Sequence, residues 1–184
     1  MSDPIFTIGH SNRTQSEFVD LLRASRIELL VDVRKLPGSA RHPQFDEDAL
    51  GEALAAEGID SHRAVGLTGR RPVSKDVPFE VNGWWENRSF HNYADHGLSE
   101  EFRDALARLL EQACERRTAV MCSEAVWWRC HRRIIADHLL AHHADVRHIL
   151  GKGHVDVAQL SAGAVTTEDG DVTYPSMLRT AAAL

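Results

Sequence analysis

The fold class of this chain is indicated most clearly by the segment Thr118-Ala-Val-Met-Cys-Ser-Glu-Ala-Val-Trp-Trp-Arg-Cys-His-Arg-Arg133. Its first residues form an apolar run that is typical of a buried β-strand, and the apolar residues from Ile134 onward repeat at the spacing of a helix face. Two cysteines, one glutamate, one histidine and three arginines lie between or beside these two elements. Since α/β folds bind ligands where a strand leads into a helix, we expect functional residues here.

Strands and helices alternate on both sides of this stretch. Apolar runs and amphipathic patterns predict strands at residues 5–8, 27–33, 59–64, 118–121 and 146–150, and helices at 46–57, 99–117 and from 134 to about 142. A further helix is expected after Ser11 or Asn12, either of which is a suitable N-cap. Residues 66–88 are expected to be irregular. This order predicts an α/β fold of three layers, in which a mostly parallel sheet carries helices on both faces.

The length of 184 residues favours one domain over two. We expect a single domain over residues 1–184, with a core at about 5–150 and a C-terminal extension at about 155–184 that contains a hairpin. No apolar run approaches the roughly 18 residues that span a bilayer, and the N-terminus lacks the pattern of a secretory signal. We therefore expect a cytoplasmic protein that does not associate with a membrane.

The charge of the chain is unevenly distributed. The formal net charge of −6 does not favour nucleic acid as a partner, although it leaves that partner open. Several basic residues nevertheless fall in segments that we expect to lie near one another: Arg63, Arg70, Arg71, Lys75, Arg129, Arg132 and Arg133. A local cationic site on an acidic protein suits a small phosphorylated or carboxylated ligand, such as a nucleotide. The sequence does not indicate the oligomeric state.

Two earlier strand ends bring further polar residues to the same edge of the predicted sheet. Gly9 permits a tight turn after the first strand, and His10 and Ser11 then open a helix whose free amides can hold an anion. His10 is also suited to general acid or base catalysis. Asp32 and Arg34 end the second strand and point to one side of it, which suits either a ligand clamp or a structural ion pair.

Cys122 and Cys130 have three interpretations. The first is a zinc or iron site completed by His131, although the seven-residue gap between the cysteines differs from the spacing of a zinc ribbon. The second is an activated thiol, because neighbouring arginines and a helix start lower the pKa of Cys130. The third is a reversible disulfide. Cys114 lies within a predicted helix, where we expect a structural role.

Four motifs in this order resemble the domain-of-unknown-function family 488: Thr7-Ile-Gly-His-Ser11, Val31-Asp-Val-Arg34 with Pro37 and Ser39, Met121-Cys-Ser-Glu124 and Cys130-His-Arg132. The resemblance covers roughly residues 5–150. It implies an α/β fold and a site composed of the motif residues His10, Ser11, Asp32, Arg34, Ser39, Cys122, Glu124, Cys130, His131 and Arg132.

Two hypotheses follow. The first is an enzyme of hydrolase or transferase type, with an anion-binding pocket at the C-terminal edge of the sheet and a nucleotide, nucleic-acid base or other small anion as substrate. The candidate catalytic residues are His10, Cys122, Glu124 and Cys130, and the candidate binding residues are Ser11, Asp32, Arg34, Ser39 and Arg132. The second is a non-catalytic module that binds zinc or iron, or senses redox state, through Cys122, Cys130 and His131.

Overall fold

The computed structural model describes residues 3–176. Residues 1–2 and 177–184, the latter belonging to the predicted C-terminal extension, lie outside the described residues. The elements in chain order are β1 (Ile5–Gly9), α1 (Gln15–Ala24), β2 (Leu29–Asp32), η1 (Pro43–Phe45), α2 (Glu47–Ala56), β3 (Asp60–Arg63), η2 (Val65–Leu67), η3 (Phe79–Val81), α3 (Arg88–His96), α4 (Glu100–Glu115), β4 (Thr118–Cys122), η4 (Trp127–Arg129), α5 (Arg132–Ala141), β5 (Val146–Gly151), β6 (His154–Val157), β7 (Val165–Thr166) and β8 (Val172–Thr173).

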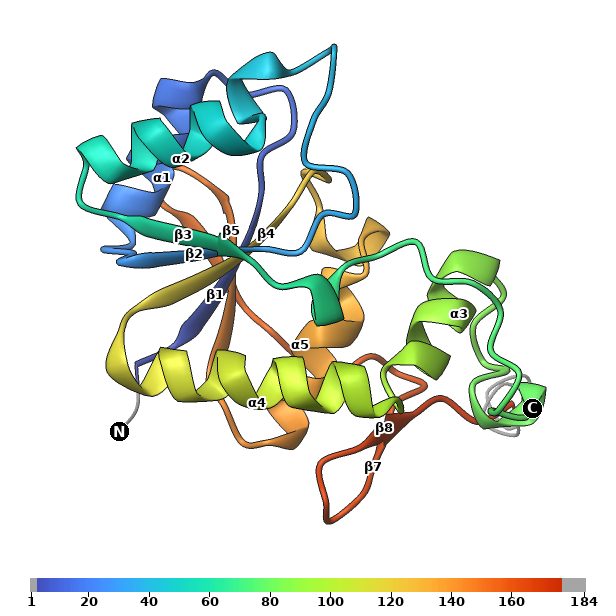
Figure 1. Cartoon of the computed structure of the whole chain (residues 1–184). Helices are drawn as coiled ribbons and strands as arrows, with labels where there is room; N and C mark the ends of the chain where they lie inside the picture. Colours follow the sequence, from blue (N-terminus) through green and yellow to red (C-terminus); the bar gives the residue numbers. More distant parts are fainter. Residues whose placement is uncertain (1–2, 177–184) are drawn as a thin grey trace.

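A six-stranded sheet forms the middle layer of the described chain, with the strand order β3-β2-β4-β1-β5-β6 (Figure 1). β3, β2, β4, β1 and β5 are parallel, and β6 pairs with β5 in the antiparallel direction. The register places Gly9 beside Cys122 and Asp32 beside Met121. The ends of β1, β2 and β4 therefore meet at one edge of the sheet, as the sequence predicts.

Helices cover both faces of the sheet, which confirms the predicted three-layer α/β fold (Figure 1). On one face, α1 and α2 contribute Phe18 and Leu54 to a cluster with Leu30 of β2. On the other face, α4 and α5 contribute side chains such as Ile135 to a cluster with Val31. Adjacent residues of β2 thus enter opposite cores, which is why this strand is apolar throughout. Within residues 3–176, no helix has the length and apolarity needed to cross a bilayer.

Three local features differ from the sequence predictions. Thr14, not Ser11 or Asn12, is the N-cap of α1, because its hydroxyl accepts from the Glu17 amide at 3.1 Å while the Glu17 carboxylate accepts from the Thr14 amide at 2.8 Å. Helix α3 was not predicted; Asn87 caps it by accepting from the amides of Ser89 and Phe90. The edge strand β6, whose residues are all exposed, was also not predicted.

The C-terminal extension is tied to the main body through buried hydrogen bonds. β7 and β8 form the predicted hairpin, although its paired strands are shorter than expected. The Tyr174 hydroxyl donates to the Asp137 carboxylate of α5 at 2.7 Å, and the Ser161 amide donates to the same carboxylate at 2.9 Å. The Tyr174 amide donates to the side chain of Asn82, in the segment that leads to α3.

Candidate functional site

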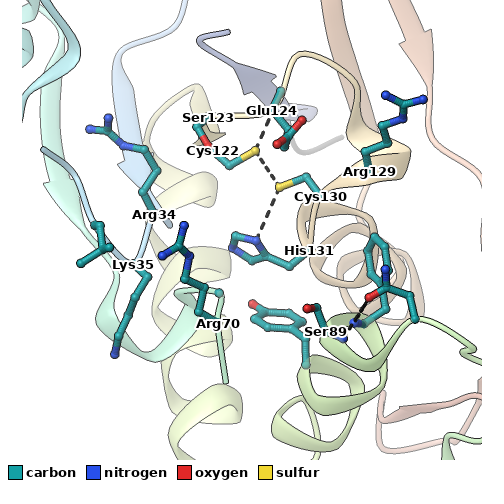
Figure 2. Close-up of a pocket in the computed structure, with 15 residues that line it drawn as sticks. Arg34, Lys35, Arg70, Ser89, Cys122, Ser123, Glu124, Arg129, Cys130 and His131 are labelled. Atoms are coloured by element: carbon teal, nitrogen blue, oxygen red, sulfur yellow. Dashed lines mark hydrogen bonds between the residues drawn. The ribbon is translucent and has the colours of Figure 1, made fainter. Parts of the chain in front are cut away.

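A pocket of about 390 Å³ opens at the edge of the sheet where β2 and β4 end (Figure 2). Five segments far apart in the sequence line it. They contribute Arg34, Lys35 and Leu36 after β2, Gly69 and Arg70 after η2, Asn87, Ser89, Phe90 and Tyr93 from the start of α3, Cys122, Ser123 and Glu124 after β4, and Arg129, Cys130 and His131 before α5. The pocket therefore combines strand ends with α3, whose Tyr93 and Ala94 belong to the apolar cluster on the α4 and α5 face of the sheet.

Cys122 and Cys130 form a buried thiol pair against the pocket, with their Sγ atoms 2.6 Å apart (Figure 2). Cys122 ends β4, and Cys130 precedes α5. The seven residues between them form a connection that brings Cys130 back beside Cys122. Cys114 lies elsewhere, exposed on α4. The pair can carry one negative charge by sharing a single proton between the two sulfur atoms.

Arg132 is fully buried behind the thiol pair and supplies the positive charge next to it. Its Nε donates to Cys122 Sγ at 2.9 Å, and its two terminal nitrogens donate to Thr7 Oγ1 and to the Glu124 carbonyl. Among the described residues, Arg132 forms no ion pair with a carboxylate. Because an isolated buried charge is very costly, the thiol pair is the natural counter-charge of this guanidinium.

The two thiols of the pair differ in acidity. Burial raises the pKa of Cys130, but the hydrogen bond to Cys122 and the charge of Arg132 outweigh this effect and lower the pKa to about 7. Burial and the neighbouring Cys130 raise the pKa of Cys122 well above its usual range. The first proton therefore leaves the pair near neutral pH, and the second is retained.

His131 is oriented toward Cys130 by its surroundings. Its Nε2 donates to the Val33 carbonyl at 3.0 Å, which leaves Nδ1 as an acceptor 3.5 Å from Cys130 Sγ. A Cβ atom at Gly69 would lie 2.8 Å from Nδ1, so glycine is needed there to make room for the ring. Burial lowers the pKa of His131. The neutral imidazole is thus placed to accept a proton from the thiol.

At the end of β2, Asp32 and Arg34 form an ion pair with each other. Arg34 Nε donates to both carboxylate oxygens of Asp32, at 3.0 and 3.1 Å, and one terminal nitrogen donates at 2.8 Å. His10 lies behind Arg34, 3.4 Å from its other terminal nitrogen, and stacks on Phe45. Burial lowers the pKa of His10 to about 4, so the ring is neutral at neutral pH.

The predicted site residues divide into two groups. Arg34, Cys122, Glu124, Cys130 and His131 line the pocket. The others do not line it: Arg132, His10 and Asp32 support lining residues from behind, Ser11 contacts Asn12, and the Ser39 amide donates to Asp46 on the exposed loop after β2. The roles assigned to these residues from the sequence stay predictions.

The three predicted metal ligands lie together, but they are turned toward one another and toward the backbone. Cys130 Sγ faces both Cys122 Sγ and His131 Nδ1, and His131 Nε2 faces the Val33 carbonyl. Across residues 3–176, no group of three or more His, Cys, Asp or Glu side chains is arranged to hold a metal ion. The zinc or iron site stays a prediction.

The sequence did not single out the α3 wall of the pocket, although it placed Arg70 and Arg129 in the cationic cluster. Asn87, Ser89, Phe90 and Tyr93 reach the pocket because α3 packs against α5 and the Tyr93 hydroxyl donates to the Leu67 carbonyl of η2. The side chain of Asn87 is the signal in the sequence, because asparagine is a frequent N-cap and marks the start of α3.

The fold and the site define a three-layer α/β protein with a thiol pair in a cationic pocket at the C-terminal edge of its sheet. The family described as "Domain of unknown function DUF488" matches residues 14–139, and the chain belongs to this family. No curated protein and no solved structure matches the chain.

Proposed function

We propose that this protein is an enzyme that binds a small anion in the pocket and attacks it with the Cys130 thiolate. The observation that carries the proposal is the position of Cys130, at the wall of a pocket with four cationic side chains and beside an acceptor nitrogen of His131. A thiolate near neutral pH is a strong nucleophile, and cations around it attract an anionic substrate.

The proposed reaction is covalent catalysis. His131 Nδ1 takes the proton of Cys130, and the sulfur forms a bond to an electrophilic atom of the substrate. The bond from that atom to its leaving group breaks, and the leaving group departs with the electron pair and receives the proton from His131. Water or a second substrate, deprotonated by Glu124, then displaces the sulfur. Hydrolysis or group transfer results, depending on the second acceptor.

The supporting residues have distinct tasks in this proposal. Arg132 stabilises the thiolate through Cys122, and its contact with the Glu124 carbonyl fixes the loop after β4. His10 holds Arg34 in place from behind, and Asp32 fixes the guanidinium orientation. Neither His10 nor Asp32 is required to touch the substrate.

Competing alkylation tests the proposal. In a Cys114→Ser background, which removes the exposed thiol, Cys130 is treated with anionic iodoacetate or neutral iodoacetamide, and the products are mapped by peptide mass. We expect half-maximal reactivity near pH 7 and an iodoacetate-to-iodoacetamide rate ratio about tenfold above that of glutathione. Arg70→Gln is expected to lower this ratio. A ratio equal to that of glutathione, or a thiol that reacts only above pH 8.5, would contradict the proposal.

A redox-sensing thiol pair is the second candidate, and the Sγ–Sγ distance of 2.6 Å favours it. A peroxide would oxidise one thiolate to a sulfenic acid, with cleavage of its O–O bond, and the second thiol would then expel water to form a disulfide. Complete, dithiothreitol-reversible conversion of Cys122 and Cys130 to a disulfide by equimolar hydrogen peroxide, faster than the oxidation of Cys114, would favour this candidate. Slow oxidation together with the expected alkylation profile would favour the enzyme.

A further inference from the structure

The pocket contains more positive charge than its own residues neutralise. Lys35, Arg70 and Arg129 line it, and among the described residues none of the three forms an ion pair. Arg34 is neutralised by Asp32, and Glu124 is the carboxylate in the lining. Arg129 lies on the Glu124 side of the pocket, and Lys35 and Arg70 lie on the other side (Figure 2). The two positive charges of Lys35 and Arg70 match the dianion of a phosphate monoester better than a carboxylate.

Arg70 is held in an unusual backbone conformation at the pocket. Its φ of 56° lies in the left-handed region, which costs a non-glycine residue about 1 kcal/mol. The preceding Gly69 packs on the His131 ring, so the chain passes close to the thiol pair just before it presents Arg70. Strain of this kind persists where the surrounding structure fixes it and is common at ligand sites.

The opposite wall of the pocket presents a flat aromatic surface. Phe90 lines the pocket, and its ring stacks on Trp85 with the centroids 4.9 Å apart and the planes 19° apart. Trp85 is buried and lies under the guanidinium of Arg133, 4.9 Å from its ring centroid. The Phe90 ring is thus fixed from behind, which is the arrangement that favours stacking of a nucleobase.

Polar groups suited to the edge of a base flank this ring. The Oδ1 atom of Asn87 accepts from the amides of Ser89 and Phe90, so its Nδ2 group is oriented and remains a donor. The Ser89 hydroxyl also faces the pocket and can donate or accept (Figure 2). Lys35 and Arg70 on one side of the pocket, and an aromatic platform with polar neighbours at the start of α3, describe a site for two parts of one molecule.

We infer that the substrate class is a 5′-nucleotide, whose phosphate binds Lys35 and Arg70 and whose base stacks on Phe90. Cys130 lines the same pocket as Lys35, Arg70 and Phe90. His131, whose Nδ1 lies 3.5 Å from Cys130 Sγ, lines it as well. A nucleotide bound across the pocket therefore covers Cys130. This inference rests on the proposed function, because it names the ligand of the same pocket.

Protection of Cys130 against iodoacetamide tests the inference in the Cys114→Ser background. The competing ligands are the four common ribonucleoside 5′-monophosphates, the matching nucleosides, ribose 5-phosphate and inorganic phosphate. We expect at least one nucleotide to protect at concentrations tenfold or more below those required for ribose 5-phosphate and for its own nucleoside. Arg70→Gln should weaken protection by all phosphate compounds.

The variant Phe90→Leu retains apolar volume but removes the aromatic face. It should abolish the tenfold advantage of the nucleotide and leave protection by ribose 5-phosphate unchanged. Phe79→Leu, at an exposed phenylalanine that does not line this pocket, is the matched control and should retain the advantage. If every nucleotide protects no better than ribose 5-phosphate, the nucleotide inference is overturned. The proposed function is judged separately by the iodoacetate ratio, so either can fail while the other holds.

Discussion

β2 and β4 lie side by side in the sheet, and each has a buried arginine at its C-terminal end. At β2 the acid is the carboxylate of Asp32, which binds Arg34 through three hydrogen bonds from the guanidinium. At β4 the acid is the thiol of Cys122, which accepts from Arg132 and is coupled to Cys130. The same arrangement of a strand-end acid and a buried arginine therefore gives a structural ion pair in one place and a reactive group in the other.

Removing the buried guanidinium of Arg132 at the β4 end should destabilise the protein more than any other substitution considered. Arg132→Met leaves the thiol pair without its positive neighbour and removes the Arg132 donors to the Glu124 carbonyl and to the Thr7 hydroxyl, which then keeps only its hydrogen bond with His148 Nδ1. We expect the free energy of unfolding to fall by about 3–5 kcal/mol, the usual cost of breaking a buried charge pair. Urea denaturation measures the change. Arg23→Met removes an exposed ion pair with Glu57 and should cost no more than about 1 kcal/mol; equal losses for both variants would refute the role of Arg132.

The free energy of unfolding should also depend on pH between 7 and 9, because the acid at the end of β4 is a thiol. The pKa of Cys130 is lowered from 9.0 to about 7 on folding, so the unfolded chain binds more protons between these values. Stability should therefore rise by about 2–3 kcal/mol from pH 7 to 9 and be lost as the pH falls through 7. Above pH 9 the raised pKa of Cys122 reverses the trend.

Denaturation in urea at a series of pH values tests this profile. Cys130→Ser should flatten the rise between pH 7 and 9 while leaving the decrease in acid. That decrease has a separate cause, because burial lowers the pKa values of His10 and His148 to about 4 and of His138 to about 3. Parallel profiles for the two proteins between pH 7 and 9 would show that Cys130 is not the titrating group.

A third, smaller effect concerns the contact that orients His131. Gly69→Ala places a methyl group against the imidazole ring, and overpacking of this kind costs about 1–3 kcal/mol. It should also slow alkylation of Cys130, since His131 must move. Gly51→Ala, inside α2 with its nearest neighbour 3.9 Å away, should instead stabilise the protein by up to about 1 kcal/mol. Thermal denaturation of both variants measures the contrast, and a stabilising Gly69→Ala would count against the described packing.

The smallest effect separates strain from function at Arg70. Arg70→Gly relieves the left-handed backbone, but part of this gain is lost to the greater entropy of the unfolded chain. We expect a stability gain below about 1 kcal/mol together with a lower iodoacetate preference at Cys130. Arg26→Gly relieves the same strain at the end of α1, at φ 54°, and should give a similar gain without changing the preference. We therefore expect the two variants to gain similar stability, while only Arg70→Gly lowers the iodoacetate preference at Cys130. A lower preference in both variants would contradict the role of Arg70.

The sheet was predictable because its strands carry a local signal. Apolar runs such as Leu29-Leu30-Val31 are continuous where a strand is buried on both faces, so they stand out in the sequence. β6 escaped prediction because it is an exposed edge strand that buries none of its side chains. Helix α3 escaped because its buried residues include His91 and Asp95, so an apolar pattern alone does not reveal its inner face.

The site was predictable only in part, and for a related reason. Cys122 and Cys130 were grouped because they lie within one strand-to-helix connection, where the distance along the chain is short. Phe90 joins them through the tertiary path of an irregular segment, which no local pattern encodes. The neutral, inward-facing state of His131 likewise depends on the Val33 carbonyl and on Gly69, both far from it in the sequence.

The hydrogen bond between Tyr174 and Asp137 determines where this chain can be truncated for expression. The match to the family ends at residue 139, yet Ala158, Val172 and Tyr174 belong to the same apolar cluster as α5. A fragment that stops at the limit of similarity would uncover that cluster and remove both donors from the Asp137 carboxylate. For this chain, the shortest piece worth cloning extends at least through Tyr174, whatever boundary a family alignment suggests.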